Sequence, residues 1–247
     1  MARLIDFYID EKKQFSEDLV LKFTMNILKG LAELHKLNII HRDIKPKNLF
    51  LRNNQIVIGD LGVAVSLESV KQSDHMLKSG GTYFYMAPEV IGGYAGNYDN
   101  DSIKKTDIWS LACVIYELFT LKKAYEGNNL TIVNEMILNG RVPEIEGSVI
   151  LRSLLNRMFK KMPQIRPSAE ELLAIINELI TEKNTADRNI IDNVIYMTMG
   201  ESCKPKTLND GKFLITTTIG KQNMLSIAED INDNQRFSKF NVERFWD

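Results

Sequence analysis

The chain has 247 residues, of which 44% are hydrophobic and 26% are charged, and its formal net charge is -1. This composition can fill a packed core and excludes a disordered or fibrous chain, and the near-zero charge argues against nucleic acid or an acidic membrane as a partner. No run approaches the ~18 apolar residues of a membrane span, and no signal peptide follows Met1, so we expect an intracellular, cytoplasmic protein.

The first quarter of the chain predicts a helix and a hairpin. Ser16 can cap a helix N-terminus, and acidic residues follow it in the first turn. An apolar stripe at helical spacing then runs to about His35: Leu19, Phe23, Ile27, Leu31 and Leu34. Two short β-rich runs, 49–51 and 56–58, predict a β-hairpin. Residues 62–106 show no sustained period, so we expect a long functional loop there.

A stretch from Ile108 to Phe119 is apolar nearly all round and contains Trp109 and Cys113. Such a helix belongs in the centre of a domain, so both side chains are expected in the core. Two more helices are predicted around Thr131–Leu138 and Val149–Phe159.

The last predicted helix starts at Ser168, where Glu171 completes a capping box, and its stripe ends near 181. Residues 182–247 are rich in polar residues and contain two strand-like runs, Val194–Met199 and Phe213–Ile219. We expect this tail to be a half-folded appendage.

The segment 41–48, with the sequence HRDIKPKN, gathers the groups that phosphoryl transfer from ATP requires. Asp43 can accept and orient the acceptor hydroxyl, Lys45 can place a cation on the transferring phosphate, and Asn48 can ligate Mg²⁺. Asp60 follows the second hairpin run, which puts a second Mg²⁺ ligand opposite the first.

These residues resemble the protein kinase signature set in type, order and approximate spacing. The resemblance continues through Asp60-Leu61-Gly62, Ala87-Pro88-Glu89, 106–110 and Arg166-Pro167-Ser168. It covers about residues 3–181 and looks most like the NIMA-related kinases. It implies a mainly α-helical large (C-terminal) lobe with a short β-hairpin, which belongs to an α+β fold in the full family. The implied cofactors are ATP and Mg²⁺, and the implied partner is a protein with a serine or threonine acceptor.

The resemblance also implies a role for each matching residue. Asp43 resembles the catalytic base and Lys45 the γ-phosphate clamp. Asn48 and Asp60 resemble the Mg²⁺ ligands, and Phe50 falls at the floor of the adenine pocket.

Further positions resemble supporting residues of the family. Thr82 resembles the threonine that contacts the catalytic Asp and Lys, Glu89 and Arg166 an internal ion pair, and Asp107 the brace of the catalytic loop. Arg42 is expected to bind a phosphate on the activation loop. Three serines are candidate acceptors of that phosphate, with the last best placed: Ser69, Ser73 and Ser79. The histidines His35 and His41 are given no catalytic role, and His35 is expected at a helix-end surface.

The family pattern fails at its beginning. The fourteen glycines contain no G-x-G-x-x-G, and no strand lysine with its paired helix glutamate is found, so the β-rich small lobe is expected to be absent. The predicted domains are therefore 1–14, a remnant of the helix after the hinge, then 15–181, the large lobe, and 182–247, an extension of unknown role.

Two hypotheses remain open for the function. The chain is either an N-terminally truncated serine/threonine kinase domain, nearly inert alone because positioning is most of kinase catalysis, or an inactive single-lobe pseudokinase. The second would act as a binding module for a regulatory or scaffold partner. A small-molecule phosphotransferase of related fold is disfavoured.

Overall fold

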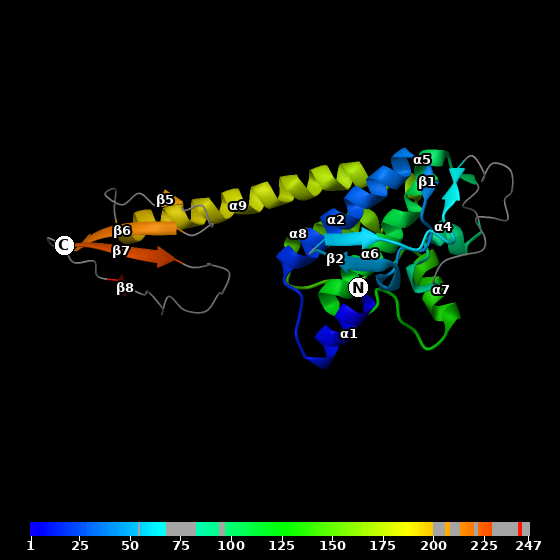
Figure 1. The fold of residues 1–247 in the computed structure, drawn as a ribbon, viewed down its shortest axis with the longest axis horizontal. Coiled ribbons are helices and arrows are strands. Elements are labelled where there is room, and N and C mark those ends of the chain that lie inside the picture. Colours follow the sequence, from blue (N-terminus) through cyan, green and yellow to red (C-terminus); the bar gives the residue numbers. More distant parts are fainter. Residues whose placement is uncertain are drawn as a thin grey trace. The chain divides into compact units, whose positions relative to one another are not determined.

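The computed structural model describes residues 1–53, 55–67, 83–93 and 97–199, and the strand residues 206–207, 213–219, 222–228 and 242–243. Side chains are described as far as residue 185. The chain divides into two compact units, Met1–Ile180 and Thr181–Asp247 (Figure 1).

The first unit is mainly helical. Its longer helices are α1 (Ala2–Asp10), α2 (Glu17–Lys36), α6 (Thr106–Thr120), α7 (Leu130–Leu138), α8 (Val149–Met158) and the start of α9 (Ala169–Met199). Its strands are β1 (Ile39–Ile40), β2 (Leu49–Arg52), β3 (Gln55–Ile58) and β4 (Val65–Ser66). Short helical turns connect them: η1 (Pro46–Asn48), η3 (Tyr83–Tyr85), α4 (Pro88–Ile91), α5 (Asn100–Lys104) and η5 (Pro163–Ile165).

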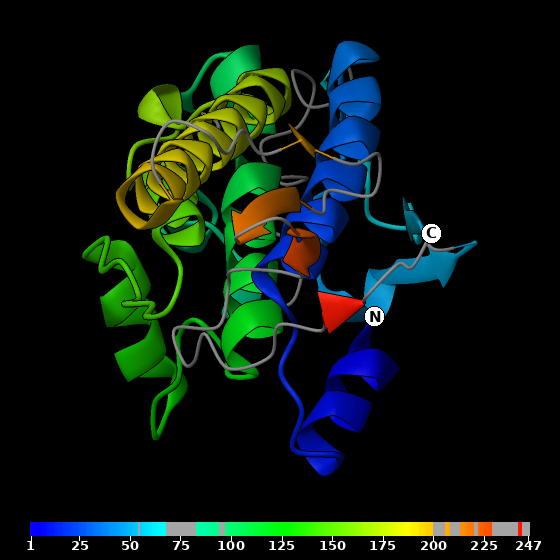
Figure 2. The ribbon, with the colours of Figure 1, turned by 90° about the vertical axis from the view of Figure 1, so that its left-hand side faces the viewer.

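Helix α6 is the centre of this unit, as its apolar sequence predicts. Trp109 is 0% exposed and Cys113 is 1% exposed, which confirms both as core residues. The aromatic ring of Trp109 packs edge-on against Phe159 at 5.1 Å between centroids. Helix α2 lies beside α6, as the blue and green helices of Figure 2 show. Burial of apolar side chains between these helices is the main stabilising term of the unit.

Both predicted helix starts are confirmed by their capping bonds. The Ser16 hydroxyl accepts a hydrogen bond from the backbone N–H of Leu19 at 3.3 Å. At the start of α9 the Ser168 hydroxyl accepts from the Glu171 N–H at 3.1 Å, and the Glu171 carboxylate accepts from the Ser168 N–H at 2.7 Å. These reciprocal bonds satisfy N–H groups that the first turn of a helix leaves unpaired.

The predicted hairpin is confirmed as the antiparallel pair β2 and β3, in which Leu49 faces Ile58 and Phe50 faces Val57. A hydrogen bond joins the hairpin to α2: the Asn26 side-chain oxygen accepts from the Ile56 N–H at 3.0 Å. Its alternation turns Leu49 and Ile56 into the core and leaves Phe50 and Val57 exposed.

One of the two strands predicted in the tail is a helix in the structure. The run Val194–Met199 is wrong as a strand, because α9 continues through Met199. Its β-branched residues also fit a helical spacing, and extending an existing helix avoids the cost of nucleation. The run Phe213–Ile219 is confirmed as β6, which pairs with β7 (Gln222–Ala228). Two short strands complete this sheet in the order β5-β6-β7-β8: β5 (Lys206–Thr207) and β8 (Val242–Glu243).

Within the ranges that the structure describes, no helix combines the length and the apolar character needed to cross a membrane. The predicted long loop at 62–106 contains β4, η3, α4 and α5, while residues 68–82 and 94–96 lie outside the described residues.

Candidate active site

The side chains of Lys45 and Asn48 both contact the carboxylate of Asp43. Lys45 Nζ lies 2.6 Å from Asp43 Oδ2, and Asn48 Nδ2 donates to the same oxygen and to the Asp43 carbonyl, each at 2.9 Å. The 3₁₀ turn η1 makes this possible, because it starts with Pro46 and closes with a bond from the Asn48 N–H to the Lys45 carbonyl. The six residues 43–48 thus bring a carboxylate, a cation and an amide together.

The loop is braced by Asp107, the second residue of α6. Its carboxylate accepts the backbone N–H of His41 at 2.9 Å and that of Arg42 at 2.8 Å. Arg42 has a left-handed backbone with φ of +70°, which costs energy in a residue other than glycine. The two bonds to Asp107 hold the chain in this conformation just before Asp43.

The structure corrects the expectation that His35 lies on the surface. His35 is only 5% exposed, and its Nε2 lies 2.9 Å from Asp107 Oδ2. The sequence contained a signal for this position, since His35 follows Leu31 by four residues and therefore continues the apolar stripe of α2. His35 thus orients the carboxylate that braces the loop at residues 41–48.

His41 connects the loop at residues 41–48 to the segment after the hairpin. The Asp43 N–H donates to His41 Nδ1 at 3.3 Å, so the proton of the neutral ring is on Nε2 and is donated to the Gly59 carbonyl at 3.0 Å. Gly59 in turn donates its N–H to the Asn48 carbonyl at 2.9 Å. These bonds hold the segment before Asp60 against the loop that carries Asn48.

Asp60 follows the hairpin as an exposed residue with φ of +62°. Its Oδ1 accepts a bond from the Gly62 N–H at 3.3 Å. The donor set suits Mg²⁺. Asn48 uses its Nδ2 on Asp43, so its Oδ1 is the atom of this side chain that can ligate a metal, and the Asp60 carboxylate offers a second oxygen ligand. Among the described residues, no group of three or more His, Cys, Asp and Glu side chains is arranged so that it could hold a metal ion. Two protein ligands are nevertheless ordinary for a Mg²⁺ that is also held by phosphates.

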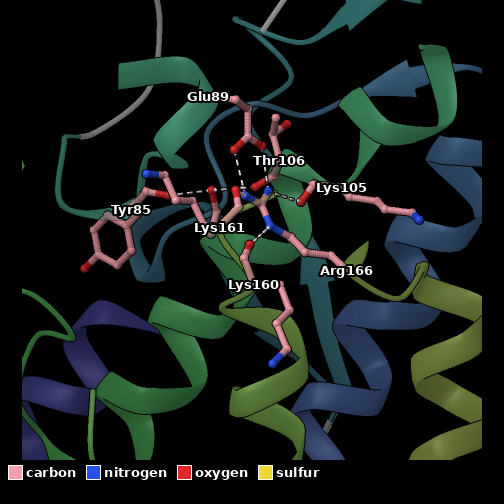
Figure 3. A network of polar contacts seen from close by, with 8 residues as sticks. Tyr85, Glu89, Lys105, Thr106, Lys160, Lys161 and Arg166 are labelled. Atoms are coloured by element: carbon pink, nitrogen blue, oxygen red, sulfur yellow. Dashed lines mark hydrogen bonds and ion pairs between the residues drawn. The ribbon is translucent and has the colours of Figure 1, made fainter. Parts of the chain in front are cut away.

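A fully buried ion pair lies near the first turn of α6 (Figure 3). Two nitrogens of Arg166 lie 2.6 Å from the two oxygens of Glu89, and both side chains are 0% exposed. The remaining guanidinium N–H groups donate to the carbonyls of Lys105, Lys160 and Lys161. All five donors of Arg166 are therefore satisfied, and the pair joins α4, which carries Glu89, to the segment before α9.

Comparison with known proteins agrees with this geometry. The family described as "Protein kinase domain" matches residues 1–175. The chain belongs to the protein kinase family. The match begins at residue 1 and does not confirm the expected absence of the small lobe, which stays a prediction.

Similar curated proteins are serine/threonine kinases of the Nek group. Serine/threonine-protein kinase Nek11 of Mus musculus is 36% identical over 178 residues, which cover 70% of this chain and 27% of Nek11. Nek5 of Mus musculus is 41% identical over 163 residues (64% and 25%), and the probable serine/threonine-protein kinase nek3 of Dictyostelium discoideum is 38% identical over 171 residues (67% and 15%). The chain thus spans about a quarter or less of the length of these relatives. The resemblance to the NIMA-related kinases is confirmed.

The segment before α4 is held by four side chains from α6, α7 and the loop between them. Glu117 accepts the Tyr85 hydroxyl at 2.5 Å, Lys123 Nζ lies 4.1 Å from the centre of the Phe84 ring, and Asn134 donates to the Tyr83 hydroxyl at 3.5 Å. The Ser110 hydroxyl also donates to the Tyr85 carbonyl at 2.7 Å. None of these tethers was predicted, because each joins residues far apart in the sequence.

Several predicted residues of this kinase region cannot be placed. Thr82, Ser69, Ser73 and Ser79 lie outside the described residues. Arg42, the predicted phosphate ligand, is half-buried, and burial lowers its pKa while the Asp107 carboxylate offsets part of that shift. Its role in binding an activation-loop phosphate stays a prediction.

The pair of Glu117 and Tyr85 is expected to make the stability of the first unit depend on pH. Burial raises the pKa of Glu117 above its ordinary value of 4.5, and the Tyr85 bond and the Lys123 charge offset part of that rise. The folded state therefore prefers the protonated carboxyl, so this stabilisation is complete below pH 4.5 and is lost as the pH rises through the folded-state pKa.

We expect the free energy of unfolding of the wild type to fall, relative to that of Glu117→Gln, as the pH rises above 4.5. The amide of the variant can still accept the Tyr85 hydroxyl but does not titrate. Urea titrations of both proteins at several pH values measure the difference, and parallel pH profiles would contradict it.

Proposed function

We propose that this protein transfers the γ-phosphate of ATP to serine or threonine hydroxyls of proteins. The main support is that Lys45 and Asn48 both contact one carboxylate oxygen of Asp43. Hydrogen bonds join the loop that carries these residues to the segment before Asp60. The protein kinase family and its Nek relatives support the reaction type.

In the proposed reaction Asp43 accepts the proton of the acceptor hydroxyl as that oxygen bonds to the γ-phosphorus. The bond from the γ-phosphorus to the leaving oxygen of ADP breaks in the same displacement. Lys45 neutralises charge on the transferring group, and Phe50 supports the adenine. A bound Mg²⁺ would neutralise phosphate charge, and Asn48 and Asp60 would hold it.

Kinase activity also requires the small lobe, whose glycine-rich loop and strand lysine bind the phosphates of the nucleotide. Residues 1–247 contain no G-x-G-x-x-G, so we propose that a small lobe completes the site. Mass spectrometry of the native product, captured with an antibody to residues 182–247, tests this directly. A mass above the 28.3 kDa of these residues by one small domain is expected, whereas 28.3 kDa would favour the pseudokinase alternative.

The alternative function is a single-lobe binding or scaffold module. Apolar side chains exposed on and after the hairpin favour it as a second candidate: Phe50, Leu51, Val57 and Leu61, each between 46% and 54% exposed. Such a module needs no nucleotide, so it predicts no binding of Mg²⁺-ATP.

Nucleotide binding therefore separates the two functions. We expect calorimetry on the native-length protein to detect Mg²⁺-ATP binding that Asp60→Asn weakens by about tenfold or more, because one metal ligand loses its charge. Asp101→Asn is the matched control, since this carboxylate is 87% exposed and pairs with its helix neighbour Lys104. Absence of Mg²⁺-ATP binding by the wild type would overturn the kinase proposal.

A further inference from the structure

The Phe50 ring lies at an unusual place on the hairpin. Phe50 is 54% exposed and faces Val57, which is 46% exposed, across the two strands. It follows Asn48 by two residues on β2, and Gly59 precedes Asp60 directly after β3. The ring is therefore an exposed apolar surface on the strand that begins one residue after Asn48, a residue proposed to hold Mg²⁺.

One edge of this ring rests against the bare backbone of Gly59. A Cβ atom at position 59 would lie 2.7 Å from Phe50 Cε2 and 2.9 Å from Cδ2. Carbon atoms do not approach this closely, so any side chain at 59 must displace the ring. Gly59 does not have a positive φ, which means that glycine is needed here for the close approach and not for the backbone conformation.

We propose that Gly59 is a positioning residue. By leaving room for the Phe50 ring against its backbone, it sets the position of that ring and thereby determines whether this surface can bind the base of the nucleotide. The proposal rests on the proposed function, because it assumes that the ring supports adenine. It adds that the base site depends on the absence of a side chain at 59, through a contact across the hairpin.

The exposure of Phe50 makes this role separable from folding. The two atoms that a Cβ at 59 would meet too closely belong to the Phe50 ring, which is more than half exposed, while the Asn48 carbonyl oxygen lies at an ordinary contact distance of 3.9 Å. The ring can swing into solvent without opening the core, so Gly59→Ala changes the shape of the surface and not the stability of the lobe.

The test is a double-mutant cycle on the native-length protein with wild type, Gly59→Ala, Phe50→Leu and the double variant. Kd is measured for Mg²⁺-ATP and for adenosine, which presents the base without phosphates. We expect Gly59→Ala to raise both Kd values by the same factor, about tenfold, with the melting temperature unchanged. In the Phe50→Leu background, Gly59→Ala should raise each Kd by less than about twofold, because the smaller leucine side chain can move away from the new Cβ.

Two variants serve as controls. Asp60→Asn should raise the Kd for Mg²⁺-ATP and leave that for adenosine unchanged, since only the metal is affected. Gly127→Ala also creates a close contact, with Ile132 Cγ2 at 3.1 Å, but in the loop before α7, so both Kd values should stay unchanged.

Each contrary outcome has one meaning. If the wild type binds Mg²⁺-ATP and Gly59→Ala binds both ligands equally well, this inference is overturned and the proposed function stands. An equal effect of Gly59→Ala in both backgrounds would also overturn it, because the effect would not pass through the ring. If the wild type binds neither ligand, the proposed function fails and the inference fails with it.

Discussion

Replacing Asp43 with asparagine is expected to slow phosphoryl transfer to serine or threonine by about 10²- to 10⁴-fold, the usual contribution of a positioned base. The amide oxygen of the new side chain could still accept the hydrogen bond from Asn48 Nδ2, now 2.9 Å from Asp43 Oδ2. The amide could not take up the proton of the acceptor hydroxyl, and the charge that pairs with Lys45 at 2.6 Å would be lost. The change therefore removes the chemistry and keeps most of the geometry.

The measurement is the rate of phosphate transfer from labelled ATP to a protein acceptor, with Kd for Mg²⁺-ATP measured alongside. We expect the Kd to change by no more than a few-fold, because Asp43 is not proposed to hold the metal. A variant that transferred phosphate at the wild-type rate would exclude Asp43 as the base.

Removing Arg166 is expected to have the largest effect on stability. Arg166→Met would leave the Glu89 carboxylate, 0% exposed, without its partner, and breaking a buried pair in this way costs about 3–5 kcal/mol. The same change would also leave the carbonyls of Lys160 and Lys161 without their donor. Because a domain is stable by only about 5–15 kcal/mol, the variant should be largely unfolded at modest denaturant concentrations.

Urea unfolding of the wild type, Arg166→Met, Glu89→Leu and the double variant checks this expectation. The double variant should be more stable than the sum of the single losses implies, since it removes both charges together. The exposed pair of Lys13 and Glu11, 3.4 Å apart, provides a control, because Glu11→Ala should cause no measurable loss. Wild-type stability of Arg166→Met would mean that the pair does not hold α4 in place.

The predictable parts of this protein are those in which local sequence determines local structure. The caps at Ser16 and Ser168, the hairpin and the buried helix α6 all follow from spacing and residue type within about twenty residues. The cluster around Asp43 is local as well, because one turn of chain separates its members.

The parts that sequence reasoning missed depend on long-range contacts. His35 and Asp107 are 72 residues apart, and Tyr85 and Glu117 are 32 residues apart, so no periodicity connects them. The end of α9 was missed for a different reason, since the run Val194–Met199 fits a strand and a helix equally well and the preceding turns decided between them.

We propose that this chain belongs to an active serine/threonine kinase in which Asp43 is the catalytic base. This proposal is tested most directly by the rate of phosphate transfer to protein serine and threonine, measured side by side for the native-length protein and for residues 1–247 alone. We expect transfer by the native-length protein, and a rate at least about 100-fold lower for residues 1–247, because positioning of the nucleotide is lost. A native-length protein with no transfer above that of its own Asp43→Asn variant would contradict the claim and favour the binding module.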